Sequence, residues 1–335
     1  MAVKQLSTYP KELLTADAKD LHALIPEATL FHLSGKQKEP LFISVLLHGN
    51  ETTGLLALQK LLIKYKDQEL PRSLSFFLGN IEAANQGVRR LDHQPDYNRI
   101  WPGTDQTETK ESQVAQEIVS IMAKRKVFAS IDVHNNTGLN PHYACITQLD
   151  NQFLQLATIF GRLVVYFTRP KGVQCGAFAQ LCPAVTLECG KPGQPHGVEH
   201  AFEYLNSCLR LSELPDRPVP AQDINVYHTV AQVKVNKGIS FSFDNPQSDL
   251  LLDKDLEQMN FTEIPAGTQL GHVFDQSNLP ITAKAETGEL VTEKFFTLVD
   301  KRLQLNKNTM PSMLTLDERV IEQDCLCYLM ERIKL

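Results

Sequence analysis

The sequence predicts an α/β protein with a mostly parallel, mixed sheet flanked by helices, followed by a second, smaller all-β domain. Over about the first two thirds of the 335 residues, apolar runs of strand length alternate with segments of helical period, which is typical of helices packed on both faces of a parallel sheet. After a proline-rich stretch the period changes to two, which indicates half-buried strands. Three of the early strands also end in a histidine or a glutamate.

Composition places the chain among globular proteins. Apolar residues make up 42% and charged residues 21%, which excludes disorder, coiled coil and collagen. The net charge of −6 comes without a long basic block, so we expect no nucleic-acid partner. The sequence lacks a signal-peptide pattern and an apolar run of the ~20 residues that a membrane span needs, so we expect a cytoplasmic protein without a membrane partner. Seven scattered cysteines without a C-x-x-C pair fit reduced thiols.

The opening strand of the predicted sheet is the apolar run 41–47, which stops at His48-Gly49-Asn50-Glu51. Leucines at helical spacing then predict a helix over 52–65. Because open α/β sheets bind their ligands at the carboxyl ends of the strands, His48 and Glu51 are expected at such an edge.

The same alternation continues through residue 209. Residues 81–103 are expected to form a long ordered loop, which is uncommon unless it lines a site. The later apolar runs end at His134 and at Glu188. Strands are predicted at 74–78, 127–133, 163–167 and 184–187, and helices around 114–122, 153–157 and 198–209.

The domain boundaries are predicted from a cluster of prolines and from a change in the spacing of apolar residues. Three prolines within 215–220 mark a linker after a first domain of residues 1–214. Beyond the linker, residues 227–235 and 239–243 alternate in polarity, so a small β-domain is predicted for 223–305. The segment 306–335 is ambiguous, and a return to the first domain is left open.

Histidine and glutamate at converging strand ends indicate a catalytic metal site. A catalytic zinc ion takes three protein ligands and leaves one position for water, and zinc lowers the pKa of bound water from ~16 to about 7. His48, Glu51 and His134 supply such a ligand set, and Glu188 is a separate carboxylate that can act as base. Asp132 lies two residues before His134, on the same face of the strand, and could orient it.

These motifs resemble the succinylglutamate desuccinylase/aspartoacylase family, a branch of the zinc carboxypeptidase-like hydrolases. The similarity covers residues 41 to about 200, and it rests on H-G-N-E-T, D-Y-N-R, D-V-H and T-L-E-C-G-K, which begin at residues 48, 96, 132 and 186. The resemblance implies that residues 1–214 are a zinc hydrolase domain. It also implies one Zn²⁺ held by His48, Glu51 and His134, with Glu188 as general base and acid.

The resemblance also implies the substrate residues. Asn98 and Arg99 are expected to hold a substrate carboxylate, to which arginine's planar fork is suited. An arginine shortly before D-x-N-R is expected to stabilise the oxyanion. Arg89 and Arg90 both qualify, at a spacing longer by one or two residues, and Arg90 is favoured. Aspartoacylase-like members carry a further arginine where this chain has Phe178, so Arg169 is proposed for that task.

The expected function is zinc-dependent hydrolysis of the amide bond of a small N-acyl amino acid or related carboxylated amide. One alternative is a metallocarboxypeptidase that acts on short peptides, and another is a non-catalytic binding protein on the same scaffold. A third is an inverted zincin, because His196-Gly197-Val198-Glu199-His200 matches H-x-x-E-H. The partner is a small molecule, and homo-oligomerisation is left open.

Overall fold

The computed structural model describes residues 3–274 and 278–334, and their contacts form two compact units. The first unit contains the chain up to Asn135 together with His142–Tyr166 and Pro170–Asn225. The second contains Asn136–Pro141, Phe167–Arg169 and the chain from Val226 onward. The C-terminal segment, for which the sequence left open a return to the first domain, therefore lies in the second unit.

The first unit is built on a mixed sheet. Its strands are β1 (Lys4–Leu6), β2 (Thr29–Leu33), β3 (Gly35–Val45), β4 (Leu70–Leu78), β5 (Ala129–His134), β6 (Tyr143–Ile146), β7 (Leu163–Tyr166) and β8 (Ala184–Glu188). Their order is β1-β2-β4-β3-β5-β8-β6-β7. The central strands β4, β3, β5 and β8 are all parallel to their neighbours within that group. Their carboxyl ends therefore share one edge of the sheet.

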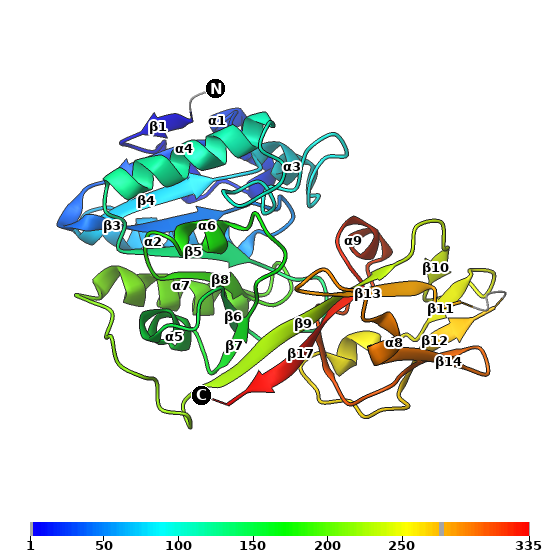
Figure 1. Cartoon of the computed structure of the whole chain (residues 1–335). Helices are drawn as coiled ribbons and strands as arrows, with labels where there is room; N and C mark the ends of the chain where they lie inside the picture. Colours follow the sequence, from blue (N-terminus) through cyan, green and yellow to red (C-terminus); the bar gives the residue numbers. More distant parts are fainter. Residues whose placement is uncertain (1–2, 275–277, 335) are drawn as a thin grey trace. The chain divides into compact units, whose positions relative to one another are not determined.

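Helices flank this sheet (Figure 1). They are α1 (Leu21–Leu24), α2 (Thr53–Tyr65), α3 (Ile81–Gln86), α4 (Lys110–Lys124), α5 (Asn151–Thr158), α6 (Gln174–Phe178) and α7 (Pro195–Arg210), with short 3-10 turns at Lys11–Leu14 and Ala18–Asp20. The predicted α/β class is confirmed. The loop predicted over 81–103 was wrong at its start, because α3 is capped by the Asn80 side chain and closed by Gly87 in the left-handed region.

The strand β3 lies between β4 and β5, and its second half is buried by apolar packing. Residues 41–47, including the polar Ser44, are at most 1% exposed. The Phe42 ring stacks on the Phe178 ring of α6, and the ring centroids are 4.4 Å apart. The strand ends at Val45, two residues before the apolar run does, because Leu46 has a φ of 56°. This left-handed turn directs the following residues across the edge of the sheet.

The second unit is rich in strands and contains two groups of them. Its elements are β9 (Asn225–Val235), β10 (Phe241–Ser242), β11 (Leu250–Leu252), β12 (Gln269–Val273), β13 (Ile281–Ala285), β14 (Phe296–Val299), β15 (Arg302–Leu305), β16 (Met310–Ser312) and β17 (Cys327–Ile333), with short helices η3 (Leu256–Met259), α8 (Thr292–Phe295) and α9 (Glu318–Gln323). β9 pairs antiparallel with β13 and β17, and β10-β11-β12-β15-β14 form a separate sheet. Both groups contribute to one hydrophobic cluster.

Within the described residues, no helix is long and apolar enough to cross a membrane.

Candidate active site

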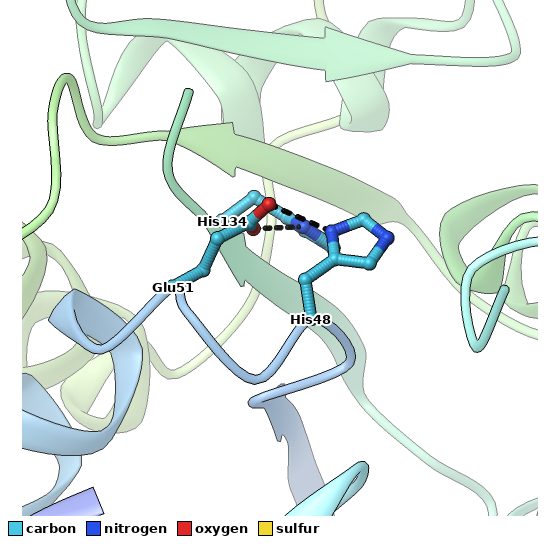
Figure 2. A group of neighbouring side chains, drawn as sticks. All are labelled: His48, Glu51 and His134. Carbon is cyan, nitrogen blue, oxygen red and sulfur yellow. Dashed lines mark hydrogen bonds and ion pairs between the residues drawn. The ribbon is translucent and has the colours of Figure 1, made fainter. Parts of the chain in front are cut away.

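Three residues from two strand ends meet at the carboxyl edge of the first unit's sheet (Figure 2). His48 and Glu51 lie in the loop between β3 and α2, and His134 is the last residue of β5. One ligand atom from each residue lies within 4.8 Å of the others, and all three residues are buried. The convergence predicted from the strand ends is therefore observed. Among the described residues this is the only group of histidine, cysteine or acidic side chains with that geometry.

Glu51 lies between the two imidazoles. Its Oε1 is 2.8 Å from His48 Nδ1 and its Oε2 is 2.7 Å from His134 Nδ1, the contacts drawn in Figure 2. The backbone N–H of Asn135 donates to Oε2 at 3.1 Å. Burial raises the pKa of Glu51, but the two histidines outweigh burial and hold that pKa far below its usual range. The carboxylate is therefore ionised at neutral pH.

Each histidine turns its other ring nitrogen to an aspartate. His48 Nε2 lies 2.9 Å from Asp96 Oδ1, and His134 Nε2 lies 2.7 Å from Asp132 Oδ2. Ser44 of β3 donates to the second oxygen of Asp132 at 2.6 Å. Carboxylates in these positions fix the ring orientation and leave both Nδ1 atoms facing Glu51. The orienting role suggested for Asp132 by its spacing fits this geometry.

The electrostatic balance of the cluster favours charged groups. Burial lowers the pKa of His134, but Asp132 and Glu51 outweigh burial and raise it well above its usual value. Burial raises the pKa of Asp96, whereas Arg89 and then His48 lower it well below the usual range. The cluster thus holds ionised carboxylates beside basic nitrogens.

Glu188 is placed by strand register. It is the last residue of β8, it lies directly opposite His134 in the parallel pairing of β5 and β8, and it is 7% exposed. Residues opposite each other in neighbouring strands project from the same face of the sheet. The carboxylate predicted as base and the last residue of the ligand set are therefore adjacent.

The two candidate arginines have different surroundings. Arg89 Nη2 donates to Asp96 Oδ2 at 2.9 Å, and its Nη1 lies 3.7 Å from Glu51 Oε1. Arg90 Nη1 instead donates to the backbone carbonyl of Gln94 at 3.0 Å, within its own loop. Arg89 therefore borders the histidine cluster, whereas the sequence favoured Arg90 for the oxyanion.

The D-Y-N-R loop also reaches the cluster. Asn98 Nδ2 lies 3.2 Å from His134 Nε2, and Asn98 Oδ1 accepts from the backbone N–H of Gln174 at 2.9 Å. Arg99 Nη1 donates to the Asn98 carbonyl at 2.8 Å. Asn98 is thus held by the first turn of α6, which connects the candidate substrate residues to the sheet.

Two other positions bear on substrate recognition. Arg169 belongs to the second unit, where its Nε donates to the backbone carbonyl of Glu286 at 3.2 Å. Phe178, where the resemblance led us to expect an arginine in aspartoacylase-like members, is fully buried against Phe42 and Trp101. It is a core residue, so any cation for that task must come from another position.

The geometry gives no support to the inverted-zincin alternative. Glu199 pairs with Lys60, and His200 Nε2 bonds the carbonyl of Phe160 at 2.6 Å. This segment is not in the metal-type group found above.

Two residues of the cluster had no assigned role in the sequence prediction. Asp96 belongs to the D-Y-N-R motif, and its position two residues before Asn98 could have indicated a second carboxylate. Asn135 is 3% exposed, and its amide donates to Thr53 Oγ1 at 2.9 Å and to the Gly190 carbonyl at 2.8 Å. It ties the start of α2 to the chain after Glu188, a link that no local sequence pattern reveals.

The donor set fits a zinc ion. Two imidazole nitrogens and one carboxylate are the ligands of open catalytic zinc sites, and each imidazole here has the outer carboxylate that such ligands usually have. His48, Glu51 and His134 would hold the ion.

The mixed sheet with its flanking helices and strand-rich second unit is a carboxypeptidase-like fold. Residues 37–201 match the model of the succinylglutamate desuccinylase/aspartoacylase catalytic domain. The chain belongs to this family, as the motifs predicted. Its members are hydrolytic deacylases, so membership indicates a desuccinylase/aspartoacylase-type hydrolase.

Solved structures show the same fold. The succinylglutamate desuccinylase of Vibrio parahaemolyticus is 16% identical with a TM-score of 0.60, and the alignment covers 98% of this chain and 97% of that one. The succinylglutamate desuccinylase of Chromobacterium violaceum is 18% identical with a TM-score of 0.58, covering 90% and 86%. Murine aminoacylase 3 is 15% identical with a TM-score of 0.59, covering 90% and 98%. A comparison with curated protein sequences gave no match.

Proposed function

We propose that this protein is a zinc-dependent hydrolase that cleaves the amide bond of a small N-acyl amino acid or related carboxylated amide in the cytoplasm. The observation that carries the proposal is the buried His48–Glu51–His134 group with Glu188 opposite His134 in the strand register. One Zn²⁺ per chain would polarise the scissile carbonyl and lower the pKa of water to about 7.

Side chains of the protein would carry out the proton transfers and stabilise the oxyanion. Glu188 takes a proton from the attacking water and returns it to the leaving amine, the usual double task of a general base and acid. Arg89 is the arginine we assign to the oxyanion, because its guanidinium borders Glu51 whereas that of Arg90 bonds a carbonyl of its own loop. Asp96 and Asp132 keep the ligand rings oriented.

A carboxylated substrate is supported by the cations near the site. Arg99 follows Asn98, whose carboxamide lies beside His134, and a guanidinium binds a carboxylate in bidentate fashion. We assign the substrate carboxylate to Asn98 and Arg99, and retain Arg169 as a candidate for a second acidic group. The similar solved structures include succinylglutamate desuccinylases and an aminoacylase, and their names motivate the choice of substrates to test.

The test combines metal analysis with a substrate panel. Protein purified without chelator should contain close to one zinc per chain and hydrolyse at least one of a panel of N-acetyl and N-succinyl amino acids. Glu188→Gln should retain zinc and lose turnover by at least about a hundredfold. Full activity of Glu188→Gln would refute the assignment of Glu188 as the general base. Cleavage of short peptides alone would favour the carboxypeptidase alternative, and absence of both zinc and turnover would favour a binding protein.

A further inference from the structure

A chain of two histidines runs from the body of the first unit toward the strand that carries Glu188. His200 Nε2 lies 2.6 Å from the Phe160 carbonyl oxygen, and His200 Nδ1 lies 2.7 Å from His142 Nδ1. A carbonyl oxygen only accepts, so the proton of a neutral His200 is on Nε2 and its Nδ1 is an acceptor. His142 must therefore donate from Nδ1. This direction fixes the His142 ring in one orientation.

The ring of His142 lies against the backbone that follows Glu188. Gly190 has a φ of 71°, and a Cβ built on it would be 3.2 Å from His142 Nε2 and 3.3 Å from His142 Cδ2. These separations are tighter than most real Cβ contacts, so the ring edge fills the space that a side chain at position 190 would need and lies beside the Gly190 backbone. The His142 ring also stacks on His196, which is exposed.

Other groups hold the same short segment from different directions. The backbone N–H of Cys189 donates to the carbonyl of His134 at 3.0 Å. The Gly190 carbonyl accepts from Asn135 Nδ2 at 2.8 Å, and the Asn135 backbone N–H donates to Glu51. The segment after Glu188 is thus fastened to a metal-ligand strand on one side, and the His142 ring limits its movement on the other.

We propose that His142 is a positioning residue that holds the Cys189–Gly190 backbone, and through it the Glu188 carboxylate, at the hydrolytic centre. The inference rests on the proposed function, in which Glu188 moves the proton. Catalysis depends steeply on placement, and a shift of about 1 Å in a reacting group can cost about a hundredfold in rate. The contacts described for His142 are with His200, His196, Phe160 and Gly190, none of them assigned to the reaction, so we infer that it acts through the backbone.

The protonation state of His142 keeps its hydrogen bond to His200 in one direction. Burial, then the nearby imidazoles of His200 and His196, lower the pKa of His142 to about 4. The imidazole is therefore neutral at the pH of the cytoplasm, and the direction of the His142–His200 hydrogen bond does not change there. A second proton on His142 would bury a positive charge and is disfavoured.

Four variants separate the ring from the hydrogen bond. His142→Ala removes both. His142→Asn keeps a donor close to the position of Nδ1 but loses the ring, and His142→Phe keeps a ring but loses the donor. His196→Ala is the matched control, because it removes a ring that stacks on His142, and His196 is not among the groups nearest to Gly190. Each is purified with its metal and compared with the wild type for zinc content, Tm, kcat and KM, and for deuterium exchange in the peptide that covers 184–194.

We expect His142→Ala and His142→Asn to lower kcat about tenfold or more, with KM and zinc content within twofold, and to exchange faster over 184–194. His142→Phe should recover part of the loss, and His196→Ala should match the wild type. Unchanged kcat and unchanged deuterium exchange in His142→Ala would overturn the proposal. A loss of kcat that is matched by a loss of zinc content or a lower Tm would also overturn it. If the wild type hydrolyses nothing in the panel, the proposed function fails separately. The exchange data then still decide whether His142 holds this segment.

Discussion

Replacing Asp132 with asparagine is the sharpest test of how the ligand set is held. Asp132 is 0% exposed, and its two oxygens contact His134 Nε2 at 2.7 Å and Ser44 Oγ at 2.6 Å. Asn keeps the shape but removes the charge. Its amide group can also face His134 Nε2, which would place the ring proton on Nδ1, the nitrogen that must be free to bind metal.

The expected loss can be bounded from the contacts. Removal of an outer carboxylate costs about 10–100-fold in metal affinity, which corresponds to about 1.4–2.8 kcal/mol. The contact at 2.7 Å is short and fully buried, so we expect the upper half of this range. Zinc affinity of Asp132→Asn and the wild type is measured by competition with a chromophoric chelator.

Ser44→Ala is the matched control, because it removes only the bond to the other oxygen of the same carboxylate. We expect it to change zinc affinity by no more than about threefold. Wild-type zinc affinity in a well-folded Asp132→Asn protein would refute the reasoning. Equal losses in Asp132→Asn and Ser44→Ala would show that packing in the strand, rather than the charge on His134, is responsible.

Three further outcomes are expected. Arg89→Ala should lower kcat about 100-fold or more while Arg90→Ala stays within about threefold, because only the first guanidinium borders the cluster; steady-state kinetics that rank them in reverse would restore the original choice. Because the pKa of His134 is raised, zinc must displace its proton, so affinity should increase from about pH 6 to 8 with proton release in calorimetry, and a flat profile would contradict this. Gly49→Ala should lower the unfolding free energy by about 1–3 kcal/mol, since its Cβ would lie 2.2 Å from a backbone nitrogen of α3, whereas Gly161→Ala has no neighbour within 4 Å and should leave the melting temperature unchanged.

Much of the first unit could be predicted because its central strands are buried on both faces. The mostly apolar runs 41–47, 74–78, 127–133 and 184–187 locate β3, β4, β5 and β8, although β3 and β4 begin several residues before their runs. The residues after them, His48, Glu51, His134 and Glu188, could then be placed at one edge from the rule for parallel strands alone. Their actual proximity follows that rule.

The elements that escaped prediction lack such a pattern. β6 has four residues and β1 three, too few to show a period. α3 has six residues and depends on caps at Asn80 and Gly87. The choice between Arg89 and Arg90 depends on how the loop bends. The two side chains are identical, and only the folded backbone decides which of them points to the cluster. The partners of Asn135 are more than fifty residues away in sequence, so only the folded chain brings them together.

The pairing of His134 with Glu188 has a consequence for variation and for engineering. Neighbouring strands lie about 4.8 Å apart whatever connects them, so the spacing of these two side chains is a property of the sheet. Loops of the connecting segment away from Asn135 and His142 can be lengthened, shortened or exchanged to suit a different substrate without moving acid and ligand relative to each other. A one-residue slip of β8 is the change that could not be tolerated, since it would turn the carboxylate to the opposite face.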